Sequence, residues 1–252
     1  MLITVDSVKK AVMEDILNSD ISVLKGVGKK IRDSYSLLNL ETLYDLVMYP
    51  PKGYEDRSEL VCVGKQMPGG PFTNTVVQIT GKSFFGQKLK NIKIDAEDVY
   101  SGVRAHLYGF NRAFLSNMIQ VGKYYRLYAN QIFQNMKFGF CFSQFELHET
   151  DFFFSEFEGE GFVPVYAVAG TLTQKIIRRD IQNALEIINH IDNSLPERFY
   201  SKFKLINTDT AVRFMHNPSD QNEIIQSKRT LGFTEVFYMQ FMAIRSHELG
   251  VK

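Results

Sequence analysis

Apolar and polar residues alternate along the middle of the chain, between residues 73 and 147. In one stretch of this region, Ala105 and Leu107 are separated by His106. A period of two is typical of a β-strand that buries one face, and turn-forming residues separate the stretches. The pattern predicts five strands, with a short helix at residues 111–119 between the third and the fourth. The predicted strands cover residues 75–84, 88–95, 102–110, 124–133 and 138–147.

The residues on either side of this region follow a helical spacing. Val8, Val12 and Ile16 lie four apart, and the prolines at 50 and 51 end the first helical region because proline cannot continue a helix. Helical spacing returns near residue 164. We expect further helices to begin at Thr171 or Thr173, at Pro196, and at Thr208 or Asp209. A long amphipathic helix is expected from Pro218 to about His247, with Ile225, Phe237 and Phe241 on one side.

The order of these elements predicts an α+β fold. Five β-strands with a helix between the third and the fourth follow the order of an OB-fold, a small barrel that often binds single-stranded nucleic acid. We divide the chain into a helical element, the barrel, a linker and a helical connector. These four segments cover residues 1–60, 61–148, 149–165 and 166–252.

Charge is distributed unevenly among these segments, although the net charge of the chain is +1. Residues 61–148 carry ten basic and four acidic side chains, whereas residues 149–165 carry five acidic and no basic ones. A basic barrel followed by an acidic, glycine-containing strip indicates a domain with its own electrostatic character and then a linker.

Composition excludes several classes of protein. Cys62 and Cys141 are the only cysteines, too few and too far apart for a disulfide framework, and no histidine cluster accompanies them to form a zinc site. We expect two reduced thiols in a cytosolic protein. The charged amino-terminal residues do not resemble a signal peptide, and no stretch reaches the length of a transmembrane helix.

No catalytic constellation is present in the sequence. The five histidines are scattered, and the HExxH, GxSxG and GxxxxGK[ST] motifs are absent. We therefore expect no catalytic residue, no bound metal and no cofactor in this chain, and no ATP hydrolysis through a phosphate-binding loop.

The stretch LKGVGKK at 24–30 is a candidate phosphate-binding turn. Gly26 and Gly28 form a tight turn before a helix, whose free N–H groups attract an anion, and Lys29 and Lys30 lie beside it. The alternative is an ordinary tight turn between two packed helices, and the sequence leaves both interpretations open.

Basic residues recur along the predicted barrel and are candidates for contacts with a DNA backbone. Their charges would supply salt-dependent contacts to phosphates. A solvated strand face is the better explanation for any single lysine, so the prediction rests on their clustering in one basic segment. The candidates are Lys88, Lys90, Lys93, Arg104, Arg112 and Arg126.

The stretch YGFNRAFL offers two aromatic side chains for stacking on bases. If Leu107 points inward, Phe110 lies on the polar face of its strand, and Asn111 is a plausible N-cap of the following helix. Phe114 would then lie one helical turn beyond Phe110, on the same side. Buried core packing and an exposed stacking surface both remain open for the pair.

Taken together, the chain resembles the amino-terminal region of the RecG family of bacterial ATP-dependent helicases. The resemblance rests on stretches that occur in the family's order along nearly the whole chain. They are LKGVGKKIRDSYSLLNLETLYDLVMYPPKGYEDRS, YGFNRAFL, PVYAVAGTLTQKIIRRDIQNAL, LPERF, AVRFMHNPSD and SKRTLGFTEVFYMQ.

The resemblance implies a DNA-binding role. In the family, an OB-type wedge domain enters the branch point of forked DNA, and its aromatic residues, here Phe110 and Phe114, stack on the exposed base pairs. Two motor domains, which hold ATP and magnesium, then pull the duplex. The chain ends at Lys252, about where the motor would begin, so we expect the motor to be absent.

The expected partners follow from the same resemblance. They are stalled replication forks and three- and four-way (Holliday) junctions, with weaker binding to single-stranded DNA and none to membranes. The resemblance also implies a monomer in the bacterial cytoplasm, associated with the nucleoid, that acts in repair and recombination. Two other functions remain open, a protein-interaction OB module and a stand-alone single-strand DNA binder.

Overall fold

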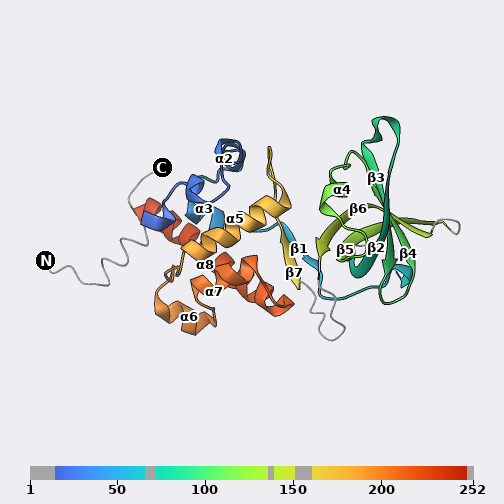
Figure 1. Cartoon of the computed structure of the whole chain (residues 1–252). Helices are drawn as coiled ribbons and strands as arrows, with labels where there is room; N and C mark the ends of the chain where they lie inside the picture. The colour runs from blue at the N-terminus through green and yellow to red at the C-terminus, as the bar shows by residue number, and fades with distance from the viewer. Residues whose placement is uncertain (1–14, 66–71, 136–138, 151–160, 249–252) are drawn as a thin grey trace. The chain divides into compact units, whose positions relative to one another are not determined.

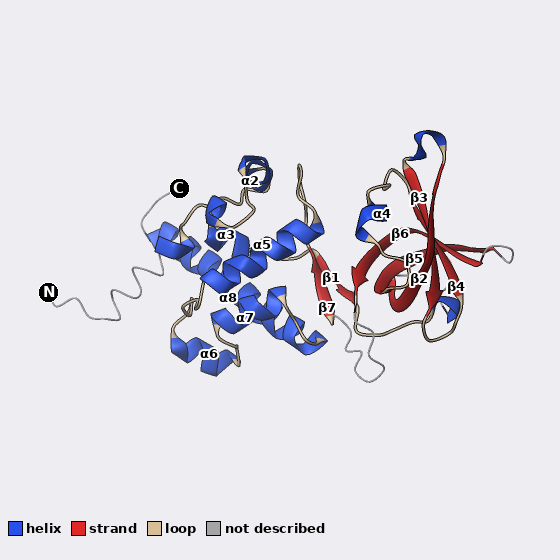
Figure 2. Ribbon diagram, in the orientation of Figure 1, coloured by secondary structure: helices blue, strands red, loops and turns tan. Residues whose placement is uncertain are grey.

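The computed structural model describes residues 15–65, 72–135, 139–150 and 161–248. The chain forms two compact units (Figure 1). One unit combines Met1–Glu55 with Gly161–Lys252, and the other is Asp56–Glu160. Most helices belong to the first unit and most strands to the second (Figure 2). We call them the helical unit and the barrel unit.

The barrel unit is a closed five-stranded barrel with OB topology. Its strands neighbour one another in the order β2-β3-β4-β6-β5, and β5 pairs again with β2 to close the barrel. The pairing of β4 with β6 is parallel and the other pairings are antiparallel. The strands are β2 (Thr73–Phe85), β3 (Asn91–Asp98), β4 (Arg104–Gly109), β5 (Tyr124–Asn135) and β6 (Gly139–Glu149). The α+β fold and the five-stranded barrel are thus confirmed.

Alternation along the strands fills the barrel, as the sequence pattern predicts. On β3 and β4 every second side chain is buried, and the intervening positions face outward. The interior therefore consists of aliphatic and aromatic side chains that come from all five strands. They include Val77, Ile79, Ile92, Ile94, Leu107, Leu127 and Phe142, which are fully buried.

Asp98 closes the turn between β3 and β4. Its carboxylate is buried and accepts hydrogen bonds from the backbone N–H groups of Val63, Tyr100 and Ser101, at 2.7, 2.9 and 2.8 Å. The hydroxyl of Thr75 donates a fourth bond at 2.8 Å. A buried carboxylate needs such donors, because an unpaired charge in the interior is costly. Asp98 thus joins the turn, β2 and the short η2 helix (Val63–Lys65).

The helical unit contains the other helices and strands, except the short helices η3 (Gln87–Leu89) and α4 (Leu115–Met118), which lie in the barrel unit. Its shared core includes residues from both halves of the sequence, among them Ile21, Leu43, Leu46, Ile177 and Ile181. Two short strands, β1 (Gly53–Asp56) and β7 (Phe162–Val165), pair with each other. The helices are η1 (Ile21–Val23), α2 (Lys29–Ser36), α3 (Leu43–Val47), α5 (Gln174–Ile187), α6 (Glu197–Phe203), α7 (Thr208–His216) and α8 (Gln221–Glu248).

The predicted segmentation differs from this arrangement in two respects. The sequence analysis treated residues 1–60 and 166–252 as two separate segments, whereas their helices pack around one shared core. They share it because α3 and α5 each bury an apolar face against the other. The predicted linker, 149–165, lies mostly outside the described residues, and its last residues form β7.

Buried polar contacts connect the two halves of the helical unit. The hydroxyl of Tyr35 on α2 donates a 2.8 Å hydrogen bond to Asp180 on α5, and Arg179 donates to the same carboxylate at 2.7 Å. On α7, Nε2 of His216 lies 2.6 Å from the carbonyl of Val47, and its Nδ1 lies 2.7 Å from the hydroxyl of Tyr166. The Tyr35–Asp180 and His216–Val47 contacts link segments more than a hundred residues apart in sequence.

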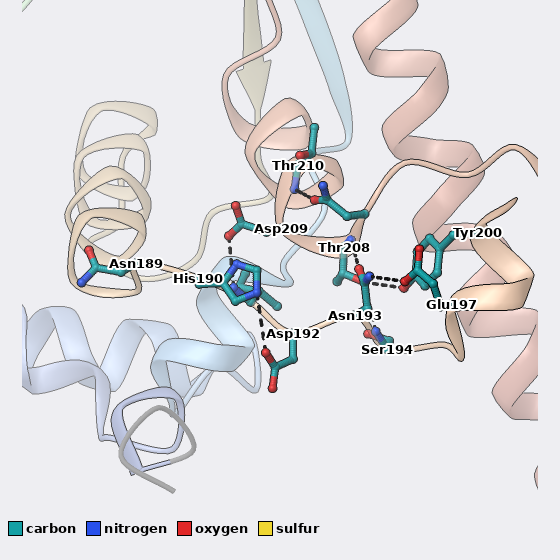
Figure 3. Close-up of polar contacts among 12 residues, drawn as sticks. Asn189, His190, Asp192, Asn193, Ser194, Glu197, Tyr200, Thr208, Asp209 and Thr210 are labelled. Carbon is teal, nitrogen blue, oxygen red and sulfur yellow. Dashed lines mark hydrogen bonds and ion pairs between the residues drawn. The ribbon is translucent and has the colours of Figure 1, made fainter. Parts of the chain in front are cut away.

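A further polar network ties the loop between α5 and α6 to the beginning of α7 (Figure 3). Thr208 is buried, and its hydroxyl lies 2.8 Å from that of Tyr200 and 3.1 Å from the backbone nitrogen of Ser194. Asp209 accepts from the backbone N–H of Ile191 at 3.1 Å, while Asn193 accepts from that of Thr208 at 3.0 Å. Because these groups bond to one another, the network supports the loop.

The helices expected after residue 164 are present, with two corrections. The N-cap of α7 is Asn207, whose side chain accepts from the backbone of Thr210, and not Thr208 or Asp209. Thr208 and Asp209 instead form hydrogen bonds with the preceding loop. On α8, Ile225 and Phe241 are exposed, so they do not form one buried face with Phe237. In the described part of the chain, no helix is both long and apolar enough to cross a bilayer.

Candidate nucleic-acid interface

The segment between β4 and β5 presents two aromatic side chains to solvent. We call residues 110–119 the rim loop; it contains the short helix α4 (Leu115–Met118). Phe110 is 57% exposed and Phe114 is 58% exposed. Since a phenylalanine ring left in water forgoes the favourable transfer to the core, exposure of both rings argues against a packing role. The structure therefore favours the stacking surface over core packing.

The rim loop begins at Gly109, where the backbone passes close to the barrel. A β-carbon at this position would lie 2.9 Å from Cγ2 of Ile92, which is fully buried on β3. Asn111 then adopts a left-handed conformation, with φ of 53°. It is therefore not the N-cap predicted from the sequence; α4 begins later, with Phe114 in the capping position. Asparagine tolerates this conformation better than most residues.

Phe110 rests against a second aromatic ring on the outside of the barrel. The rings of Phe85 and Phe110 are 5.9 Å apart and nearly perpendicular, and Phe85 makes the same kind of contact with Tyr108. Edge-to-face pairs at such distances are favourable. Sequence reasoning missed Phe85. The predicted hairpin could have identified it, because Phe85 directly follows the first predicted strand and faces the start of the second.

Two of the candidate lysines lie in the hairpin turn next to the rim loop. Lys88 and Lys90 follow Gly86 between β2 and β3, and both are exposed. The carbonyl of Lys90 accepts a 3.1 Å hydrogen bond from the backbone of Ala113, so this turn and the rim loop are in contact. In the described residues, no ion pair joins either lysine to an acid. Their charges are available to phosphates beside the exposed rings.

Lys93 is engaged with its own strand. Its ammonium lies 2.8 Å from Asp95, whose carboxylate is also 2.6 Å from Nδ1 of His106. Burial of Asp95 would raise the pKa of its carboxyl, but the hydrogen bonds from Lys93 and His106 outweigh burial and hold that pKa below its usual value. Lys93 is therefore partly neutralised within the protein.

The three candidate arginines do not gather around the exposed rings. Arg112 belongs to the rim loop, but its guanidinium donates a 3.3 Å hydrogen bond to the carbonyl of Phe145 and lies over that ring. Arg104 is at the opposite end of β4, about 17 Å along the strand from Gly109. Arg126 lies on β5, where it pairs with Val76 of β2, away from the hairpin turn. The structure thus brings together Phe110, Phe114, Lys88 and Lys90.

The glycine turn at 24–30 belongs to the helical unit. Gly26 has a φ of 90°, and a β-carbon there would lie 3.3 Å from the guanidinium of Arg179. Gly28 is the N-cap of α2 and has no side chain to cap it, while Lys29 and Lys30 are exposed at the start of that helix. The packing of Arg179 on the turn supports the structural interpretation and leaves phosphate binding a prediction.

No metal centre is formed by the described residues, in the sense that no three His, Cys, Asp or Glu side chains cluster to hold an ion. Cys62 and Cys141 are both free thiols, and burial raises the pKa of Cys141.

Curated relatives of this chain are helicases. The "ATP-dependent DNA helicase RecG" of Thermotoga maritima is 27% identical over 240 residues, covering 91% of this chain and 29% of the relative. The protein of the same name from Treponema pallidum is 28% identical over 226 residues, covering 89% of this chain and 32% of the relative. The chain thus spans about three tenths of the length of these relatives.

A solved structure has the same fold. The structure of RecG bound to a three-way DNA junction matches 92% of this chain and 32% of that chain, with a TM-score of 0.75 and 23% sequence identity. The profile of the RecG wedge domain matches residues 20–188, a range that includes the barrel, the rim loop and four helices of the helical unit, η1, α2, α3 and α5. On this match the chain belongs to the RecG wedge domain family.

Proposed function

We propose that this chain binds branched DNA and places the rim loop at the point where the duplex arms separate. The observation that carries the proposal is the exposure of Phe110 and Phe114 on a loop that the barrel supports. A flat ring can stack on a base whose neighbour has been removed, and such a base is available where a duplex ends or divides. Lys88 and Lys90 lie nearby to contact phosphates.

Two similarities support the choice of branched DNA over plain duplex. The chain belongs to the RecG wedge domain family, and the protein in the matching solved structure is bound to a three-way junction. The relatives are named as ATP-dependent helicases, but this chain has no GxxxxGK[ST] motif. We therefore propose that this chain contributes DNA binding, and that ATP and magnesium act in parts of the relatives that it does not match.

The proposal extends to the cellular role. A protein of the relatives' length would use this region to engage stalled forks and four-way junctions during repair and recombination. It would act as a monomer in the bacterial cytoplasm, close to the nucleoid, and bind single-stranded DNA more weakly than forks.

The test is binding of this chain to a synthetic fork, a matched duplex and a single strand, each at two salt concentrations. Stacking on an aromatic ring contributes ~1–3 kcal/mol per base, so Phe110→Ala with Phe114→Ala should weaken fork binding by at least about tenfold. Duplex binding should change little, because phosphate contacts dominate it.

Tyr100→Ala is the matched control, because this ring is also exposed but lies on the turn at the other end of the barrel. Equal affinity for fork and duplex in the unaltered chain would contradict the proposal. Tightest binding to the single strand would indicate a stand-alone single-strand binder. A weak salt dependence without preference among the three DNAs would indicate a protein-interaction module instead.

A further inference from the structure

Four hydrogen bonds connect the hairpin between β2 and β3 to the rim loop. We call residues 82–91 the brace hairpin. Asn91 accepts a 2.9 Å hydrogen bond from the backbone of Asn111 through its side-chain oxygen, and the carbonyl of Lys90 accepts from Ala113. The ammonium of Lys82 donates to the carbonyls of Ser116 and Ile119, at 2.6 and 3.0 Å. The brace hairpin therefore holds the rim loop at both its beginning and its end.

Lys82 stabilises helix α4, the part of the rim loop that would be unstable on its own. Helix α4 has only four residues and no side-chain cap at its start, and helices this short are unstable alone. A cation at the last carbonyls of a helix satisfies acceptors that have no partner within it and opposes the helix dipole. Lys82 supplies that cation from a neighbouring strand.

The position of Lys82 on β2 explains how it reaches α4. The register of β2 against β3 shifts between Ile79 and Gly81, and Lys82 then pairs across from Ile94, which is buried inside the barrel. Lys82 thus lies on the inward-facing side of β2, near the end of the strand. Its side chain is nevertheless exposed, and its ammonium reaches the carbonyls of Ser116 and Ile119 in the rim loop.

We infer that Lys82 and Asn91 are positioning residues that fix the rim loop before DNA binds. The inference rests on the proposed function, since it concerns the same rings. A loop ordered in advance loses less conformational entropy on binding than one that orders around its ligand. Neither residue needs to touch DNA for this role; each acts through the backbone that carries Phe110 and Phe114.

The test compares Lys82→Met with Lys88→Met. Both remove one positive charge from the same hairpin, but only Lys82 contacts α4. Amide hydrogen exchange of Asn117 and Ile119, measured by NMR without DNA, should accelerate by about tenfold in Lys82→Met, because charge-assisted bonds to the helix end are lost. Exchange in Lys88→Met should match that of the unaltered chain.

The same variants are then tested for binding to the fork and the duplex. In Lys82→Met the preference for the fork should fall several-fold, whereas Lys88→Met should weaken fork and duplex alike and leave the preference in place. Asn91→Leu should behave as Lys82→Met does. The conservative variants Asn91→Asp and Lys82→Arg should retain the preference for the fork. A carboxylate can accept from the backbone of Asn111, and a guanidinium can donate to the carbonyls of Ser116 and Ile119.

The outcomes separate this inference from the proposed function. If the unaltered chain shows no preference for the fork, the proposed function fails and the inference falls with it. If the preference is present and Lys82→Met retains it, only the inference is overturned. Unchanged exchange of the α4 amides in Lys82→Met would also overturn it, as would an equal loss of preference in Lys88→Met.

Discussion

At the scale of single residues, burial distinguishes side chains that the sequence presents alike. Phe110 and Phe114 occur in a pattern that suits a core or a surface equally, and only the folded chain shows them exposed. Lys93 and Lys90 look equivalent in the sequence, but Lys93 is paired with Asp95. The residue types were predictable, whereas their partners depend on strand register, which sequence patterns locate only approximately.

His216 makes the stability of the helical unit dependent on pH. Burial lowers the pKa of His216 to about 4, from 6.5, and the hydrogen bond to Val47 only partly opposes this. The unfolded chain therefore binds a proton as the pH falls below 6.5, while the folded chain does so only near pH 4. We expect the free energy of unfolding to fall by up to about 3 kcal/mol across this range.

Urea unfolding of the helical unit, followed by circular dichroism between pH 7.5 and 4.5, measures this effect. His216→Gln is the control, because glutamine can donate to Val47 but does not titrate. The variant should be less stable at neutral pH and should lose most of the pH dependence. An unchanged pH dependence in His216→Gln would assign the effect to another group.

At the scale of elements, strands and helices followed the sequence pattern more closely than the connections between them did. The five predicted strands overlap the observed ones, and α5, α6 and α8 begin near the expected residues. The rim loop differed, because the predicted helix at 111–119 is reduced to α4. Local propensity could not anticipate this, since the backbone N–H groups of Asn111 and Ala113 donate hydrogen bonds to Asn91 and Lys90, which hold the residues before α4 in another conformation.

Gly109→Ala should disturb the rim loop and the barrel together. The added β-carbon would lie 2.9 Å from Ile92, which is fully buried and cannot move away freely. We expect a loss of about 1–3 kcal/mol in the free energy of unfolding of the barrel unit. Thermal unfolding measures the loss, and Gly64→Ala is the control because its β-carbon would make an ordinary 3.5 Å contact with Val103. Equal stability of the two variants would contradict the expectation.

At the scale of the whole molecule, the described residues form two hydrophobic cores that share no residue. The sequence analysis located the barrel, whose alternating pattern is continuous along the chain. It did not join the two helical regions, because their contacts cross an interval of about a hundred residues and leave no local periodic signal.

Separate cores predict separate responses to mutation. Leu107 in the barrel and Leu46 in the helical unit are both fully buried, and truncation of either to alanine should cost about 2–5 kcal/mol. We expect Leu107→Ala to accelerate hydrogen exchange in the barrel strands and leave α5 protected, and Leu46→Ala to do the reverse. Mass spectrometry of peptide fragments measures both. Equal acceleration in both units by either variant would indicate a single cooperative unit.

The pairing of β1 with β7 means that the chain leaves the helical unit and re-enters it through neighbouring strands, with Lys52 donating to Val165 at 2.8 Å. The barrel is thus an insertion in the sequence of the helical unit, and the two ends of the insertion lie next to each other. A helical scaffold of this kind can accept barrels of different sequence without a break in its own core.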